Sequence, residues 1–211
     1  MRLAFALSIL LVGSPVAALA EEPLRENTPE ARQAVERYGQ CVAQREPGEA
    51  HRLLSMDFTT SRYQTGLRLL AKEAQRDCAR DSVGRGAMRS AGLLLSGAIA
   101  EALLEADAIP LNTRLVRSAT TPVKSYSPTD SVAQCLARSM PDQVMALFAT
   151  APSSDAEASA AAPLMRAMPT CASAVGIAAK VEPTVPALRA MIATASYRIV
   201  KAGVAGQEAA R

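Results

Sequence analysis

Two stretches of the chain, CVAQREPGEAHRLL at residues 41–54 and CLARSMPDQVMALF at residues 135–148, follow one pattern. Each begins with Cys, places Pro six residues later and ends on a pair of large apolar residues. Pro is tolerated in the first turn of a helix, whereas the residue before Pro is disfavoured inside one. Each stretch therefore predicts the end of one helix and the start of the next.

The similarity extends beyond these two stretches. At an offset of 94, Gln40 and Cys41 align with Gln134 and Cys135. At an offset of 93 the second cysteine and four apolar positions also align: Cys78, Leu95, Ile99, Ala100 and Ala102 with Cys171, Leu188, Ile192, Ala193 and Ala195. Cysteines and apolar positions are what a shared packing scheme preserves. We therefore interpret the chain as an internal repeat.

The expected fold is all-α, with two tandem homologous helical units of about three to four helices each. The first unit covers residues 21–107 and the second 129–202. Between them, residues 108–128 contain Pro110, Pro122 and Pro128 among Ser and Thr, which is typical of a linker. The segment LNTRLVRS at 111–118 is a weak strand candidate. Residues 203–211 have no apolar face and predict a flexible tail.

Residues 1–20, MRLAFALSILLVGSPVAALA, have the features of a secretory signal peptide. Arg2 precedes a short apolar run, and the segment ends in the small-x-small sequence Ala18-Leu19-Ala20. No later segment approaches the length of apolar sequence that spans a bilayer. We therefore expect a periplasmic or secreted protein that starts at Glu21 and has no transmembrane segment.

The four cysteines fall into two pairs with separations of 37 and 36 residues. Four cysteines allow three pairings, and a repeat selects one of them, because an ancestral single unit bonds only within itself. We predict disulfides between Cys41 and Cys78 and between Cys135 and Cys171, one in each unit. An oxidising compartment allows such bonds to persist.

The sequence offers no motif that assigns an activity, so we expect no catalytic residue, cofactor or metal site. The one histidine, His51, aligns with Met145, which neither shuttles protons nor binds zinc, so we expect its replacement to cost little. Glu101 lies in an apolar helical stretch, where burial would raise its pKa and suit it to acid catalysis. Its helical phase allows it to face solvent or a groove between the units.

Surface charge suggests two kinds of partner. Arg68, Lys72 and Arg76 recur every four residues and place three cations on one helix face, which suits solvent or an anionic envelope surface. The second unit has fewer charges and carries several Met residues, which are core filler or an apolar patch for another envelope protein: Met140, Met145, Met165, Met168 and Met191. The formal charge of +3 argues against nucleic acid.

The repeated Cys-Val, Pro, Leu-Leu and Cys pattern, with the AEAL sequence at residues 100–103, resembles uncharacterised secreted helical proteins of Gram-negative bacteria with a duplicated Cys-containing unit. This resemblance covers nearly all of residues 21–211 and implies no known activity. The second unit departs from it at Thr194, which aligns with Glu101. We expect an exported, non-catalytic binding or scaffolding module. The alternative is a cell-envelope enzyme that uses a carboxylate such as Glu101 in an inter-unit groove.

Overall fold

The computed structural model describes residues 28–83, 92–178 and 181–209. In these ranges every regular element is a helix, in agreement with the all-α prediction. The helices are α1 (Pro29–Arg45), α2 (Pro47–Leu54), α3 (Ser61–Val83), α4 (Gly92–Glu105), α5 (Leu111–Arg117), α6 (Pro128–Ser139), α7 (Pro141–Phe148), α8 (Asp155–Ala174) and α9 (Val185–Ala209). The predicted signal peptide, residues 1–20, lies outside the described residues.

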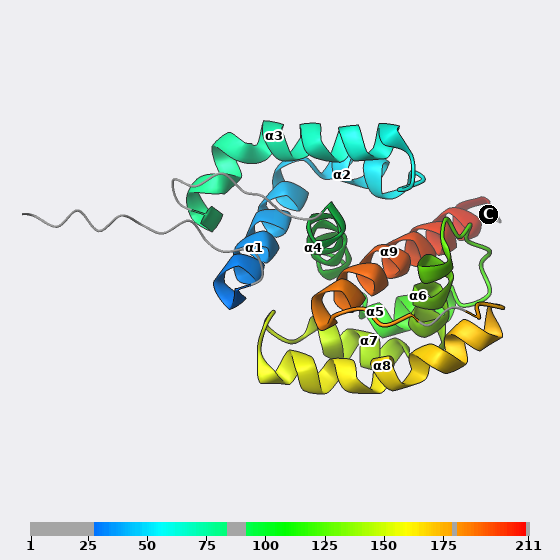
Figure 1. Ribbon diagram of the computed structural model, residues 1–211. Coiled ribbons are helices and arrows are strands. Elements are labelled where there is room, and N and C mark those ends of the chain that lie inside the picture. The colour runs from blue at the N-terminus through cyan, green and yellow to red at the C-terminus, as the bar shows by residue number, and fades with distance from the viewer. Residues whose placement is uncertain (1–27, 84–91, 179–180, 210–211) are drawn as a thin grey trace, which may run out of the picture.

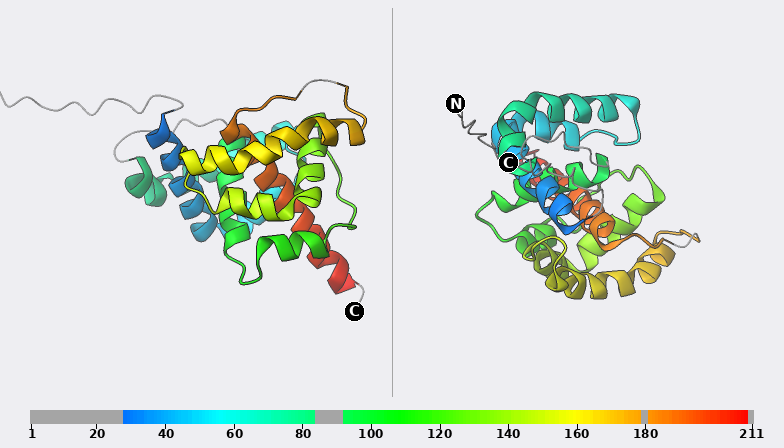
Figure 2. Two further views of the ribbon diagram at one scale, coloured as in Figure 1. Left: turned by 90° about the horizontal axis from the view of Figure 1, so that it is seen from below. Right: turned by 60° about the vertical axis from the view of Figure 1, so that its left-hand side comes forward.

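Helices α4 and α9 cross at the centre of the molecule (Figure 1). Helices α1 to α3 lie on one side of this crossing and α5 to α8 on the other, so that α3 and α8 form opposite outer edges (Figures 1 and 2). Both central helices are rich in Ala and Gly, which allows their backbones to approach closely. A Cβ atom on Gly97 would lie 2.5 Å from Cα of Ala190, so only glycine fits at this crossing.

Local signals explain where the helices begin. Thr28 accepts a hydrogen bond from the Ala31 amide at the start of α1, and Ser154 accepts one from the Glu157 amide at the start of α8. Pro47 and Pro141 each occupy the first position of a short helix, α2 and α7. Residues 41–54 and 135–148 therefore contain the α1–α2 and α6–α7 junctions, as their sequences predict.

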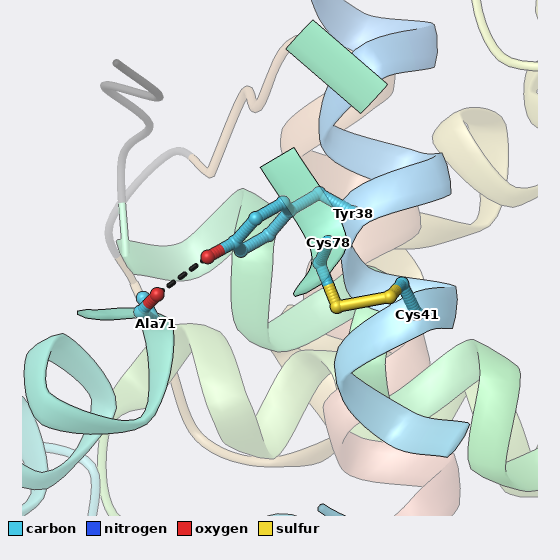
Figure 3. Close-up of a disulfide and its surroundings, with 4 residues drawn as sticks. All are labelled: Tyr38, Cys41, Ala71 and Cys78. Carbon is cyan, nitrogen blue, oxygen red and sulfur yellow. Dashed lines mark hydrogen bonds between the residues drawn. A yellow bond between two sulfur atoms is a disulfide. The ribbon is translucent and has the colours of Figure 1, made fainter. Parts of the chain in front are cut away.

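Two disulfides connect Cys41 to Cys78 and Cys135 to Cys171, which is the pairing expected from the spacing. The first joins α1 to α3 and the second joins α6 to α8. In each pair the two Cα atoms are 5.6 Å apart. Beside the first bridge, the buried side chain of Tyr38 crosses from α1 to α3 and donates a hydrogen bond to the Ala71 carbonyl (Figure 3). Covalent and polar ties thus reinforce the same helix pair.

Two segments differ from the expectation. The weak strand candidate at 111–118 is wrong, because this part of the expected linker forms α5. Leu111 and Leu115 are four residues apart, as helical neighbours are, and both are buried. The expected tail also differs, because α9 continues to Ala209 and buries Gly203 against Ser118. In the described ranges, no helix is long and apolar enough to cross a membrane.

Candidate functional site

A buried cluster around Arg189 joins the two sides of the molecule. Arg189 on α9 is 6% exposed and Glu101 on α4 is 2% exposed. The guanidinium binds both carboxylate oxygens of Glu101, with Nε donating to Oε2 at 2.9 Å and Nη2 donating to Oε1. This bidentate geometry gives the strongest type of charge-assisted hydrogen bond in proteins. The pair is therefore a fixed connection between α4 and α9.

The remaining donors of Arg189 reach the second half of the molecule. Nη1 donates to the Thr150 carbonyl at 3.0 Å and to Glu157 Oε1 at 3.2 Å, and Nη2 donates to the Phe148 carbonyl at 3.3 Å. The other oxygen of Glu157 accepts a hydrogen bond from the Ser153 amide at 2.7 Å. One arginine thus holds α4, the end of α7 and the start of α8 together.

The cluster contains more negative than positive charge. Glu36 on α1 and Glu105 on α4 lie close enough to Glu101 and Arg189 to influence their ionisation. The pKa of Glu101 is raised to about 8, chiefly by burial and to a smaller extent by Glu36 and Glu105, while the hydrogen bonds and charge of Arg189 oppose the rise. Burial also raises the pKa of Glu36. Burial therefore opposes the ionisation of Glu101 and Glu36, and the positive charge of Arg189 favours it.

A second buried arginine, Arg198, lies nine residues further along α9, on the opposite side of the helix. Arg198 forms an ion pair with Asp130 on α6, and both side chains are almost fully buried. Its guanidinium carbon lies 5.5 Å from the ring centre of Phe58 and 5.2 Å from that of Tyr126. Asp130 also accepts a hydrogen bond from the Tyr126 amide at 2.9 Å. This cluster packs a loop of the first half against the second half.

His51 contacts Tyr197 where α2 meets α9. Its Nδ1 lies 2.6 Å from the Tyr197 hydroxyl, and the two rings stack with centres 5.7 Å apart. Burial, with a smaller contribution from Lys201, lowers the pKa of His51. His51 is therefore half-buried and paired with Tyr197, an interaction that its alignment with Met145 does not predict.

The outer side of α3 carries four exposed cations, which we call the basic face: Arg62, Arg68, Lys72 and Arg76. Glu73 and Asp77 flank it, which leaves an excess of two positive charges. Beside its N-terminal end, a wide, open depression of about 650 Å³ lies between α2 and α3. The lining residues are Arg52, Ser61, Arg62, Thr65, Gly66 and Leu69, and none is an acid, histidine or cysteine.

The structure places the predicted site residues in different environments. Glu101 faces neither solvent nor a groove, because it is buried against Arg189. Arg68, Lys72 and Arg76 are exposed on one helix face, as expected. Of the five Met residues, Met168 is buried, Met145 is 37% exposed and the other three are partly buried, as core filler would be. In the described ranges, no group of three or more acids, histidines or cysteines is placed to hold a metal ion.

Sequence reasoning missed the partners of Glu101. Arg189 and Arg198 lie in an apolar helix, and this alone was a signal that both pair with buried acids. Glu157 and Asp130 are in the first turns of α8 and α6, where they also accept hydrogen bonds from the amides of Ser153 and Tyr126. Each of these acids thus has two roles, one at its own helix start and one in an ion pair with an arginine on α9.

Comparisons with protein-family models, with curated proteins and with solved structures return no match to this chain.

Proposed function

We propose that the protein is an exported, non-catalytic helical binding module of two homologous units, and that it docks on an anionic envelope surface through the basic face of α3. The observation that carries the proposal is the uneven distribution of charge. By sequence, α3 has five cations and three acids, whereas α8, in the corresponding place, has one cation and two acids. A surface that concentrates one sign of charge attracts partners of the opposite sign.

The proposed duplication is supported by the central crossing. Gly97 and Ala190 are equivalent at the offset of 93, and these equivalent residues are in contact. Contact between a residue and its own equivalent is typical of a two-fold interface. The order of four helices and the disulfide between the first and the third also recur in the two halves. We infer that the units meet as the subunits of a fused dimer.

The geometry favours a binding role over the alternative of an envelope enzyme. A catalytic carboxylate must reach its substrate. Both oxygens of Glu101 instead bind Arg189, and the side chain is 2% exposed. The depression beside the basic face offers arginines, hydroxyls and an apolar side chain, which suit recognition of an anion. Export is supported by residues 1–20 and is compatible with the two disulfides.

A soluble polyanion tests the docking surface. We expect the protein to bind immobilised dextran sulfate at low salt and the R68Q/K72Q/R76Q variant to elute at a clearly lower salt concentration. The matched control is R117Q/R166Q/K201Q, which removes three exposed cations from α5, α8 and α9. It has the same net charge as the test variant, so net charge alone predicts equal elution.

Equal elution of the two triple variants would contradict docking through α3. Wild-type protein that passes through the column would contradict an anionic partner altogether. Export is tested separately by N-terminal sequencing of the protein from the periplasm or medium, where we expect Glu21 as the first residue. Recovery of intact residues 1–20 on a membrane-bound protein would refute export.

A further inference from the structure

We propose that the anionic surface is a phospholipid membrane, on which the outer side of α3 lies with Leu69 in contact with the lipid and Arg62 on a headgroup phosphate. This inference rests on the proposed function and narrows its partner to one class. It depends on the placement of apolar and polar side chains among the cations, whereas the proposed function depends on charge alone.

A single line of exposed side chains runs along α3. Arg62, Thr65, Leu69, Lys72 and Arg76 follow one another at alternating steps of three and four residues, which places them on one face of a helix. The line combines a hydroxyl and one large apolar side chain with three cations, and the exposed acid Glu73 lies beside it, one turn after Leu69. Helices that lie on anionic membranes combine apolar and cationic side chains in this way, although with more apolar residues than here.

Leu69 distinguishes a membrane from a soluble polyanion. Its side chain is 53% exposed, although it is large and apolar. The offset of 94 aligns it with Pro163 on α8, where the cations Arg62 and Arg76 are replaced by Ala156 and Thr170. A sulfated or phosphorylated polymer offers nothing for Leu69 to contact. A bilayer interface offers anionic headgroups and an apolar interior within the reach of one helix face.

The depression supplies a place for one phosphate group. In the part of the chain that the structure describes, Arg62 forms no hydrogen bond or ion pair, and it is one of the residues that line the depression. Ser61 and Thr65 add hydroxyl groups beside it. Arg52, on the opposite wall, is held by Glu49 on its own helix, so its position is defined before a ligand arrives. Arginine is well suited to phosphate because its planar fork donates two parallel hydrogen bonds.

Vesicle co-sedimentation tests the proposal. We expect the exported protein, purified from the periplasm or medium, to sediment with vesicles that contain phosphatidylglycerol and to remain in solution with phosphatidylcholine alone. R62Q and R76Q should each weaken binding about fivefold, since one cation near an anionic membrane contributes about 1 kcal/mol. L69S should weaken vesicle binding several-fold and leave elution from dextran sulfate unchanged.

Two matched controls isolate the α3 face. V116S replaces an apolar side chain on α5 that is 62% exposed, and R166Q replaces an exposed cation on α8. Neither should change vesicle binding by more than twofold, and circular dichroism should show unchanged helix content in every variant. If V116S weakens binding as much as L69S does, the membrane contact is not specific to α3 and the proposal fails.

A soluble headgroup separates a membrane from a free phosphate ligand. Glycerol phosphate should compete with vesicles only weakly, because it lacks the apolar chains and the neighbouring headgroups. Strong competition that R62Q abolishes would identify a soluble phosphate compound as the ligand and overturn the membrane assignment. Binding to dextran sulfate through α3 without binding to anionic vesicles would also overturn it, yet would leave the proposed function in place.

Discussion

The helices of the first half, α1 to α4, and those of the second, α6 to α9, follow the same order with the same disulfide, but their outer surfaces differ. The third helix of the first half, α3, exposes four cations, whereas its counterpart α8 is rich in Ala and contains two prolines, Pro163 and Pro169. The inner positions instead agree, as Leu95 and Leu188 show, both being buried.

This contrast separates the residues that hold the frame from those that give each half its own properties. Cysteines, Pro47 and Pro141, and apolar positions recur at the aligned positions. The proposed duplication explains this recurrence by a shared helix packing in each half. Charged positions differ, and the polar network at the centre is one-sided: Glu101 and Arg189 form the buried pair, while their equivalents Thr194 and Ser96 are neutral. Variants at equivalent positions therefore test how far the two halves are alike.

The largest effect should come from Arg189, which has a neutral equivalent. The R189A variant leaves Glu101 and Glu157 buried without their cation, and removal of one partner from a buried ion pair costs about 3–5 kcal/mol. We expect a loss near the upper end of this range in urea unfolding, because two carboxylates and two carbonyls lose their donor. R166A, at an exposed position on α8, should cost less than about 0.5 kcal/mol. Similar losses for the two variants would refute the structural role of the cluster.

The disulfides should show that the halves are equivalent. In the chain-entropy model each bridge stabilises the fold by about 4 kcal/mol, because both close loops of nearly equal length. The double variants C41S/C78S and C135S/C171S should therefore lose similar amounts of unfolding free energy. Non-reduced peptide mapping should find the remaining bridge intact in each. A link between Cys41 and Cys135, or four free thiols in exported protein, would contradict the pairing.

The pH dependence of stability should show the effect of Glu101, which aligns with the neutral Thr194. The pKa of Glu101 is raised in the folded protein to about 8 from its ordinary value of 4.5, so the folded state holds this proton more tightly than the unfolded state. Stability from this group is therefore complete below pH 4.5 and is lost as the pH rises through about 8. We expect the E101Q variant to show a flatter decline of melting temperature across this window. An unchanged slope would show that Glu101 does not titrate there.

The smallest effect distinguishes His51 from its equivalent, Met145. H51A removes the hydrogen bond to the buried Tyr197 hydroxyl and should cost about 1 kcal/mol. M145A changes an exposed side chain without a polar partner and should cost no more than about 0.5 kcal/mol. Thermal unfolding of both variants measures the difference. Equal costs would show that the contact with Tyr197 contributes nothing to stability.

Much of the fold could be predicted because its signals are local. Pro47, Pro141 and the caps at Thr28 and Ser154 each act within one helical turn, so their meaning does not depend on the rest of the chain. The disulfide pairing followed from the interpretation of the two stretches as a repeat. Helix α5 was missed because Pro and Ser dominate its surroundings, although the spacing of Leu111 and Leu115 indicates a helix.

The central cluster could not be predicted because its contacts are remote in sequence. Glu101 and Arg189 are 88 residues apart, and they meet only because α4 and α9 cross at Gly97. The rotation of α4 about its axis decides between burial and exposure of Glu101, and its apolar residues alone allow both. The depression between α2 and α3 likewise depends on how two helices are spaced, which the sequence does not encode locally.

The two disulfides also determine how the chain responds to mechanical force. Stretched fully, the 37 residues from Cys41 to Cys78 would span about 120 Å, but the bridge holds their Cα atoms 5.6 Å apart. The same holds for Cys135 and Cys171. Pulling on the ends therefore leaves two closed rings that add almost nothing to the extended length. A protease or unfoldase that pulls the chain through its pore from either end meets two disulfide-closed loops. At each loop, either two or more strands enter the pore together or the disulfide is first reduced.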